Sequence, residues 1–382
     1  MRILIIRNYP SYMDVSCNTY NIQEVGLAKA LIRKGHQCDI VFWTEKEEMN
    51  KVIKFDKGLS YTIHYRKGIN VLKNAIYTGI DELIDNYDII QTAEYNQIQS
   101  WILSKKYKDK AIIYHGPYYS EFNKKYNLMC KIFDIVFLNR YKKLGTNFIV
   151  KSELAKEFLV KKGIDKSNVI NVGVGIDLDA LINEKSQEQP SFIRNIDKYE
   201  SDLKLLYIGR IEPRRNIPFI YDILSELARR GKNVKLIMVG NGEKGYVEEC
   251  QEYAKKIGVE NLIYSTEKLE QKYLSELYRK SDFFLLPTKY EIFGMVLLEA
   301  MYYKLPVLTT LNGGSDCLIN NGENGIILEC NVKEWANIIL KLNSDRSTYQ
   351  EIANKAYETI KNEYTWEKIS QKILNSYEKL VK

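Results

Sequence analysis

The chain repeats one pattern almost from end to end: a short apolar run, a break, and then a stretch with helical spacing. The first run, Met1–Asn8, is rich in isoleucine and leucine and alternates little, as strands buried on both faces do. Segments with helical spacing, such as Ile22–Lys34, separate several of the runs. The pattern predicts an α/β fold with doubly wound parallel sheets. The other predicted strands are Gln37–Thr44, Leu59–Tyr65, Tyr87–Thr92, Ala111–His115, Asn147–Val150, Val169–Val174, Leu203–Ile208, Val234–Val239, Leu262–Tyr264, Phe283–Leu286, Val307–Thr309 and Gly325–Leu328.

The length of the chain, 382 residues, favours two domains over one. The alternation of strands and helices lapses into a polar, proline-containing stretch before it resumes at Leu203. We therefore expect an N-terminal domain at 1–180, a linker region at 181–202 and a C-terminal domain at 203–365. The remaining residues, 366–382, have the spacing of an amphipathic helix.

The composition is that of an ordinary globular protein, with 45% hydrophobic and 27% charged residues. No apolar run approaches the length of a membrane span, and the N-terminus lacks the pattern of a signal peptide. The six cysteines are scattered and form no C-x-x-C pair, which is typical of free thiols in a reducing compartment. We expect a cytoplasmic protein.

The positive charge is concentrated in one part of the N-terminal half. Residues 105–166 carry 15 basic and 6 acidic side chains, a local net charge of +9. Within them, residues 124–143 combine basic ends with apolar side chains, and two structures fit this pattern. One is an interfacial helix that docks on an anionic membrane surface. The other is a buried helix with solvated basic ends. The apolar side chains concerned are Leu128, Met129, Ile132, Phe133, Val136 and Phe137.

Two carboxylates are associated with one strand–loop–helix segment in the C-terminal half. The predicted strand at Phe283–Leu286 is followed by a loop that carries Glu291 and Gly294. A helical stretch comes next and contains Glu299. Loops at the carboxyl ends of parallel strands are where open α/β sheets bind ligands, and a helix N-terminus there suits a phosphate.

The segment P-x-x-x-E-x-F-G-x-x-x-x-E-A-M, which spans Glu291 and Glu299, resembles the signature of glycosyltransferase family 4. The resemblance implies the GT-B fold, in which two Rossmann-like domains face each other across a cleft. It also implies a retaining enzyme whose second domain binds a nucleotide-sugar and whose first domain binds the acceptor. The terminal helix at 366–382 would pack back on the first domain. Without the family pattern, Glu291 and Glu299 would be read as a loop charge and a solvated helix charge.

The same resemblance assigns further residues of the second domain. Arg210 and Arg215 match two basic positions that hold the diphosphate of the donor, although Arg214 is an alternative to Arg215. Fixed cations there would stabilise the charge that develops on the leaving diphosphate. Gly240 lies in a G-x-G loop that is either near the nucleotide or simply a turn.

In the first domain, His115 matches a family histidine that lies near the donor sugar, and the alternative is a histidine that caps a turn. A loop that commonly carries two adjacent glycines has none here, so Asn18 or Thr19 is expected to replace the backbone contacts to the diphosphate. Glu291 is expected to bind sugar hydroxyls and Glu299 the ribose. The complete predicted site consists of Glu291, His115, Arg210 and Arg215 as catalytic residues, with Glu299, Gly294, Phe293, Met295, Gly240, Asn18 and Thr19 as substrate-binding residues.

We therefore predict a retaining, metal-independent hexosyltransferase that uses a UDP- or GDP-sugar, needs no cofactor and does not bind nucleic acid. Its acceptor is expected to be a glycan or a lipid-linked molecule in cell-envelope, polysaccharide or glycoconjugate synthesis, with the protein at the inner face of the membrane. The D-x-D sequence at Asp177 and Asp179 is treated as coincidence. Two alternatives stay open: a catalytically silent GT-B module that binds glycan or membrane, and a dinucleotide-dependent Rossmann epimerase or oxidoreductase. The second would require G-x-G-x-x-G after the first strand, which Met1–Tyr20 lacks.

Overall fold

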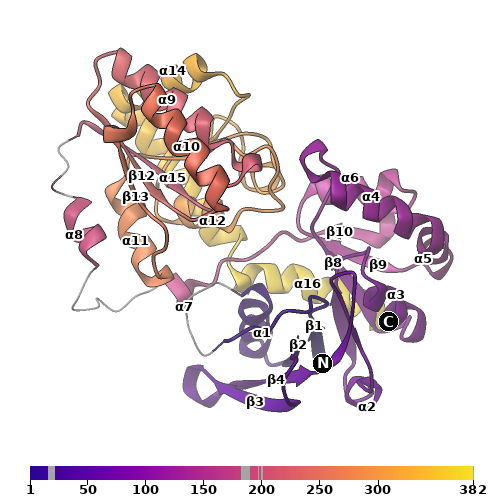
Figure 1. Ribbon diagram of the computed structural model, residues 1–382. Helices are drawn as coiled ribbons and strands as arrows, with labels where there is room; N and C mark the ends of the chain where they lie inside the picture. The colour runs from indigo at the N-terminus through magenta and orange to yellow at the C-terminus, as the bar shows by residue number, and fades with distance from the viewer. Residues whose placement is uncertain (16–21, 182–189, 197, 199–200, 382) are drawn as a thin grey trace. The chain divides into compact units, whose positions relative to one another are not determined.

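The computed structural model describes residues 1–15, 22–181, 190–196, 198 and 201–381, which form two compact units. Unit 1 comprises residues 1–15, 22–175 and 364–381, and unit 2 comprises the described part of 176–363. In each unit a parallel or mostly parallel sheet is packed against helices (Figure 1). The doubly wound α/β class predicted from the sequence is confirmed.

Unit 1 is built on an eight-stranded sheet with the order β10-β9-β8-β7-β1-β2-β4-β3. All neighbouring strands are parallel except β3, which runs antiparallel to β4 at one edge. The central strands are buried on both faces, which explains why they appear in the sequence as continuous apolar runs. The strands are β1 (Arg2–Ile6), β2 (Gln37–Trp43), β3 (Met49–Lys54), β4 (Ser60–Arg66), β7 (Ile89–Ala93), β8 (Ala111–His115), β9 (Asn147–Val150) and β10 (Val169–Asn171).

The last helix of the chain, α16, belongs to unit 1 and packs on α1 (Figure 1). The contact is close, because a Cβ atom added to Gly26 of α1 would lie 2.2 Å from Nε1 of Trp366. Farther along α16, the hydroxyl of Tyr377 donates to Oε1 of Gln91 at 2.7 Å in the interior. The helices of unit 1 are α1 (Gln23–Arg33), α2 (Asp81–Ile84), α3 (Ile98–Lys106), α4 (Lys124–Phe133), α5 (Asn139–Leu144), α6 (Glu153–Lys161) and α16 (Trp366–Val381).

Three strands of unit 1 were not predicted. One is the edge strand β3, and the others form the hairpin of β5 (Gly68–Val71) and β6 (Asn74–Tyr77). Strand β3 is largely exposed, so it lacks the apolar run that marks a buried strand. Strand β10 also ends earlier than expected, at Asn171. The side chain of Asn171 accepts from the backbone of Gly173 at 3.2 Å, and the φ of 78° at Gly173 turns the chain out of the sheet.

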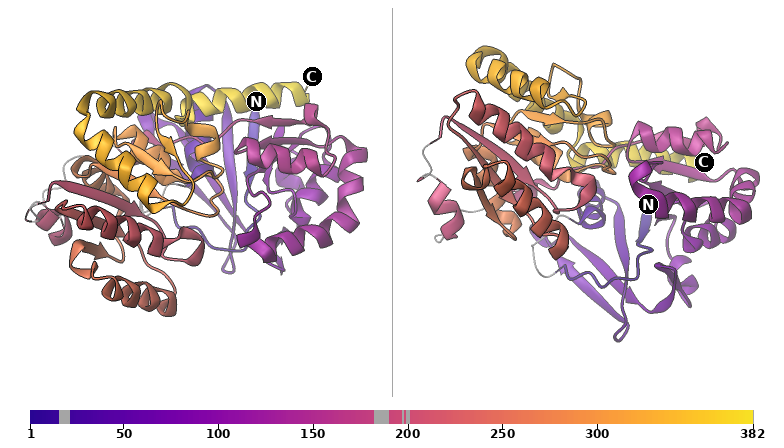
Figure 2. Two further views of the ribbon diagram at one scale, coloured as in Figure 1. Left: turned by 90° about the horizontal axis from the view of Figure 1, so that it is seen from above. Right: turned by 45° about the horizontal axis from the view of Figure 1, so that its top comes forward.

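Unit 2 is built on a six-stranded, fully parallel sheet with the order β13-β12-β11-β14-β15-β16. All six strands predicted for this half are present. Helix α9 packs against both α10 and α14, and α12 packs on α15. Figure 2 shows the chain from two further directions. The strands are β11 (Leu203–Ile208), β12 (Val234–Val239), β13 (Ile263–Thr266), β14 (Phe283–Leu286), β15 (Val307–Thr309) and β16 (Ile326–Ile327). The helices are α7 (Leu178–Leu181), α8 (Ser191–Ile196), α9 (Ile217–Arg229), α10 (Lys244–Lys256), α11 (Gln271–Lys280), α12 (Met295–Tyr302), α13 (Ser315–Leu318), α14 (Val332–Ser344) and α15 (Arg346–Glu363).

The described part of the stretch expected as a linker contains a short helix, α8. Helix α8 attaches to unit 2 through Phe192, whose ring stacks on that of Tyr264 with 4.3 Å between the ring centroids. Its two buried side chains, Ile193 and Ile196, add to this contact with the core. No helix among the described residues combines the length and the apolar character that crossing a membrane would require.

Candidate active site

Three loops meet at the carboxyl edge of the unit 2 sheet, after β11, β14 and β15. Strands β11 and β14 are neighbours, and so are β14 and β15, which brings the loops together. The backbone N–H of Lys289 donates to the carbonyl of Arg214 at 2.8 Å, and that of Gly313 donates to the carbonyl of Glu291 at 3.0 Å. These hydrogen bonds fix the positions from which the side chains of the first two loops project.

Glu291 and Arg215, predicted as separate contacts for sugar and phosphate, form an ion pair with each other. Nη1 of Arg215 contacts Oε2 of Glu291, and the two side chains are only 11% and 13% exposed. The other oxygen, Oε1, accepts from the backbone N–H of Ile292 at 2.9 Å. Burial disfavours the charged guanidinium, but Glu291, Tyr207 and Glu212 together outweigh this effect, so the pKa of Arg215 is raised.

The second arginine of this loop also lies beside Glu291. Nη1 of Arg214 is 3.6 Å from Oε2 of Glu291 and donates to the carbonyl of Tyr290 at 2.7 Å. Nη2 of Arg214 is 2.6 Å from a carboxylate oxygen of Glu212. Two guanidinium groups therefore share one carboxylate. Arg210 is outside this group, with an exposed side chain and a carbonyl that accepts from the hydroxyl of Tyr207 at 2.7 Å.

Glu299 lies in the interior of unit 2 and is only 3% exposed. Nε2 of Gln271 donates to Oε1 at 2.9 Å, and the hydroxyl of Tyr278 donates to Oε2 at 2.7 Å. Burial raises the pKa of Glu299 to about 7, although both hydrogen bonds oppose this effect. Gln271 and Tyr278 belong to α11 and were not predicted as site residues, because no motif links them to Glu299.

For the remaining predicted residues of unit 2, the informative features are backbone conformation and close packing. Gly294 is the N-cap of α12 with a φ of 75°, a conformation that favours glycine, and Met295 begins the helix half-buried. Phe293 is buried, and a Cβ atom at Gly314 would lie 1.6 Å from its carbonyl oxygen. A Cβ atom at Gly240 would lie 1.8 Å from the carbonyl oxygen of Gly209. Close packing of two loops therefore explains the glycine at position 240 without a ligand.

In unit 1, His115 ends β8 and is fully buried beside a glutamate that the sequence analysis did not select. Nδ1 of His115 is 2.7 Å from Oε2 of Glu94, which also accepts from the backbone N–H of Gly116 at 3.0 Å. Nε2 of His115 is buried and has no hydrogen-bond partner among the described residues. Burial favours the neutral form of Glu94, but the hydrogen bond and charge of His115, with help from Lys151, lower its pKa.

Glu94 has a φ of 62°, in the left-handed region that residues other than glycine rarely adopt. A signal for it was present, because Glu94 directly follows β7, the sheet neighbour of β8. Two other predicted residues, Asn18 and Thr19, lie outside the described residues. Asp177 accepts from the backbone N–H of Asp179 at 3.1 Å in a local turn. Within the described residues, no three histidine, cysteine or acidic side chains are grouped as a metal site.

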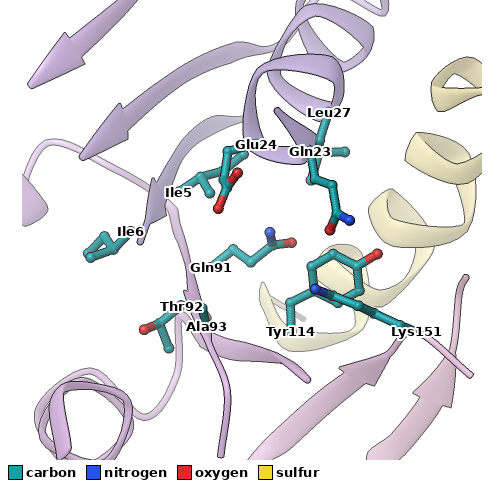
Figure 3. A pocket seen from close by; sticks show the side chains of 10 residues that line it. All are labelled: Ile5, Ile6, Gln23, Glu24, Leu27, Gln91, Thr92, Ala93, Tyr114 and Lys151. Atoms are coloured by element: carbon teal, nitrogen blue, oxygen red, sulfur yellow. The ribbon is translucent and has the colours of Figure 1, made fainter. Parts of the chain in front are cut away.

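Polar side chains of unit 1 also line a small cavity of about 40 Å³ (Figure 3). It lies at the carboxyl ends of β1, β7 and β8 and has room for a few water molecules. Oε1 of Glu24 accepts from Nη1 of Arg7 at 3.1 Å, while Nζ of Lys151 lies 5.1 Å from the centre of the Tyr114 ring. The residues that line it are Ile5, Ile6, Gln23, Glu24, Leu27, Gln91, Thr92, Ala93, Tyr114 and Lys151.

Comparison with solved structures identifies the fold. A protein from Anabaena, HepE, crystallised in complex with UDP, superposes with a TM-score of 0.72 at 17% identity, covering 99% of this chain and 100% of that one. Sucrose-phosphate synthase from Thermosynechococcus elongatus gives the same TM-score at 15% identity, with 100% and 99% covered. Both alignments extend over essentially the whole chain, and they support the GT-B fold.

Relatives with curated descriptions point the same way. An uncharacterized glycosyltransferase of Methanocaldococcus jannaschii is 24% identical over 371 residues, which is 92% of either chain. A probable sucrose-phosphate synthase of Thermosipho melanesiensis is 28% identical over 186 residues, or 48% of this chain and 43% of that one. The chain thus matches less than half the length of the latter relative.

The match to a family model falls on the part of the chain that carries the three loops. Residues 188–359 match the model described as glycosyl transferases group 1. This range includes Arg215, Glu291 and Glu299. The first two lie on loops at the carboxyl edge of the unit 2 sheet, and Glu299 lies on helix α12, which follows the second loop. The match identifies residues 188–359 as a segment of the group 1 glycosyltransferases, family 4, and the solved structures that cover the whole chain show the GT-B fold.

Proposed function

We propose that the protein is a retaining glycosyltransferase that moves a hexosyl unit from a nucleotide-sugar to an acceptor hydroxyl. The observation that carries the proposal is the partly buried group of Glu291, Arg214 and Arg215 at the carboxyl edge of the unit 2 sheet. Two fixed cations beside one carboxylate suit a ligand that presents both phosphate oxygens and hydroxyl groups. A sugar diphosphate has both.

Unit 2, and with it the domain expected at 203–365, is the proposed donor-binding part. Arg215 and Arg214 would contact the diphosphate, with Arg210 supplying a further charge from its exposed position. As the bond to the sugar breaks, charge accumulates on the diphosphate, and cations already in place stabilise it with little reorganisation. Glu291 would accept hydrogen bonds from hydroxyls of the donor sugar. Because these cations supply the positive charge, we propose that no divalent metal is required.

Glu299 is the proposed contact for the ribose. Its two oxygens accept one hydrogen bond each from Gln271 and Tyr278, and a carboxylate oxygen can accept a second. Phe293, Gly294 and Met295 would place the N-terminus of α12 near the nucleotide, with the loop at Gly240 beside them. The Anabaena neighbour is described with UDP and with UDP-glucose, which favours a UDP-sugar over a GDP-sugar as the first donor to test.

Unit 1, which contains most of the domain expected at 1–180, is the proposed acceptor-binding part. His115 would contact the donor sugar or the acceptor through Nε2, while Glu94 holds its other nitrogen. Asn18 and Thr19 keep their expected role toward the diphosphate. As the sugar acquires oxocarbenium character, the leaving diphosphate would accept the proton of the incoming hydroxyl.

The acceptor is proposed to be a glycan or a lipid-linked molecule, and the reaction to belong to cell-envelope, polysaccharide or glycoconjugate synthesis in the cytoplasm. Among the relatives, a capsular polysaccharide glycosyltransferase of Staphylococcus aureus is 26% identical over 249 residues. A lipopolysaccharide N-acetylglucosaminetransferase of Salmonella typhimurium is 28% identical over 198 residues. A catalytically silent module that only binds glycan is the second candidate, because the ion pair of Glu291 and Arg215 could bind a sugar without transferring it.

One screen followed by one assay separates these candidates. UDP-, GDP- and ADP-sugars are first compared by thermal shift, and the best donor is then incubated with the protein to measure release of the nucleoside diphosphate. The proposal expects stabilisation by one class of donor and slow hydrolysis that Arg215→Ala abolishes, while the surface variant Arg229→Ala keeps it. Stabilisation without any hydrolysis or transfer to added acceptors would favour the silent module. No stabilisation by any donor would contradict the proposed transferase.

A further inference from the structure

A row of exposed apolar side chains runs along α4 and the π-helical turn at Asp134–Leu138 that follows it. Leu128, Ile132, Ile135 and Val136 are 59%, 54%, 84% and 47% exposed. They are spaced by four, three and one residues, so they lie on one side of the helical segment. We call these four residues the docking face.

The opposite side of the same segment is anchored in unit 1. Cys130, Phe133 and Tyr141 are buried, and the ring of Phe133 packs edge-on against Tyr95 with 5.7 Å between the centroids. The segment therefore contributes to a core through one side and leaves the docking face outside it. Of the apolar side chains expected at a membrane interface, Phe133 and Phe137 were placed wrongly, because Phe133 is buried in this core and Phe137 packs against it. Ile135, which was not among them, is the most exposed of the docking face.

The docking face is surrounded by exposed positive charge. Between positions 119 and 143 there are six basic and two acidic side chains. One of the acidic ones, Asp134, is neutralised by an ion pair with Lys162. The six basic side chains are all exposed: Lys124, Lys125, Lys131, Arg140, Lys142 and Lys143.

We propose that the docking face binds the surface of an anionic lipid bilayer. The four apolar side chains would enter the headgroup region, and the surrounding lysines would lie against lipid phosphates. Each contribution is modest alone, and together they give stable but reversible attachment. A second copy of the chain fits less well, because it would bring an equal excess of positive charge against this one. The inference concerns a surface of unit 1 and does not depend on the proposed transfer reaction.

The test uses the full chain and flotation with two kinds of vesicle, pure phosphatidylcholine and phosphatidylcholine with about 30% phosphatidylglycerol. We expect binding to the anionic vesicles at low salt and its loss at about 0.5 M salt, where surface charges are screened. The variant Ile132→Gln/Ile135→Gln should bind at least about tenfold more weakly, because it removes two apolar side chains from the interface. The matched control Ile69→Gln/Leu72→Gln alters equally exposed residues, 58% and 73%, on the β5–β6 hairpin and should bind normally.

A second pair of variants tests the charges. Lys124→Gln/Lys131→Gln should lose about tenfold in binding at low salt, and Lys255→Gln/Lys256→Gln, on exposed positions of α10, should lose nothing. Circular dichroism and thermal midpoints confirm that each variant is folded. Absence of binding at low salt, or equal losses in variants and controls, would overturn the proposal. A third outcome would also overturn it: the wild type does not bind vesicles and sediments as a dimer in the ultracentrifuge, and Ile132→Gln/Ile135→Gln dissociates this dimer. The docking face would then bind a second copy of the chain.

Discussion

Glu291 and Arg215 lie on loops that follow different strands, yet their side chains form a largely buried ion pair. The sequence analysis assigned them to different parts of a ligand. Their pairing means that each holds the other in position before any ligand arrives. It also means that a substitution at either position changes the environment of the other.

Arg215→Ala should weaken both binding of the nucleotide-sugar and folding. The loss of a charge-assisted contact to the diphosphate is expected to cost about 1.5–3 kcal/mol in transition-state stabilisation. The buried carboxylate of Glu291 loses its main partner, so unfolding should also become easier by up to about 3 kcal/mol. Steady-state kinetics and urea unfolding measure the two effects.

Arg214→Ala is the matched comparison, because Arg214 is farther from Glu291 and the carboxylate of Glu291 keeps its contact with Arg215 in this variant. We expect it to cost less in both measurements. A larger kinetic loss in Arg214→Ala than in Arg215→Ala would assign the diphosphate contact to Arg214.

The pKa of about 7 at Glu299 predicts that the stability of unit 2 depends on pH. A carboxyl group titrates near 4.3 in an unfolded chain, so the folded protein binds the extra proton between these values. The stabilisation is complete below about pH 4 and is lost as the pH rises through 7, by about 4 kcal/mol in total.

Glu299→Gln carries a permanently neutral side chain of the same size and should remove this dependence. Urea unfolding at pH 5.5 and pH 8.5 is the measurement. The difference in unfolding free energy between the variant and the wild type should favour the variant more at pH 8.5 than at pH 5.5. An identical pH profile for both proteins would show that Glu299 is charged throughout, contrary to the effect of its burial.

Glu94 is predicted to act on catalysis through His115. In Glu94→Gln the imidazole loses its charged partner, and turnover should fall by about 10- to 100-fold, the scale for groups that orient a functional histidine. Binding of free UDP should stay unchanged, because neither Glu94 nor His115 is among the proposed diphosphate contacts. The pH profile of kcat should shift in Glu94→Gln and not in the control His36→Gln. A loss of thermal stability without any change in the pH profile would reduce Glu94 to a structural role.

Metal independence is a prediction of its own. Turnover should survive extended treatment with EDTA, because arginine side chains are proposed to take the place of a divalent cation. Loss of turnover that magnesium or manganese restores would contradict it.

The sequence predicted the strands of the two sheets better than the contacts of the site. Buried parallel strands must be apolar on both faces, so they appear as runs that can be recognised one by one. The exposed strand β3 and the β5–β6 hairpin carry no such run and were missed. A helix such as α8 within a polar stretch depends on tertiary contacts, such as the stacking of Phe192 on Tyr264, which local sequence does not encode.

The site shows the same division. The family pattern marked Glu291 and Glu299, and the structure adds that Gln271 and Tyr278 of α11 already bind the second of them. Glu94 belongs to no motif and became visible only when β7 and β8 were found side by side. Spacing along the chain identifies residues within one loop, whereas partners that come from another element require the fold.

The central claim is that Glu291 acts on the sugar and not on the nucleotide, and Glu291→Gln tests it most directly. The variant keeps the size of the side chain and removes its charge, which weakens hydrogen bonds to sugar hydroxyls and releases Arg215 for a phosphate. Glu299→Gln is the control. The proposed partner of Glu299 is the ribose, so this variant should bind free UDP more weakly.

The measurement is kcat/KM for the donor selected by thermal shift, together with the affinity for free UDP by titration calorimetry, in wild type and Glu291→Gln. The account predicts a loss of about 2–4 kcal/mol in transition-state stabilisation, which is about 30- to 1000-fold in rate, with UDP affinity unchanged or higher. Turnover near that of the wild type would contradict the role of Glu291, and so would a fall in UDP affinity as large as the fall in rate.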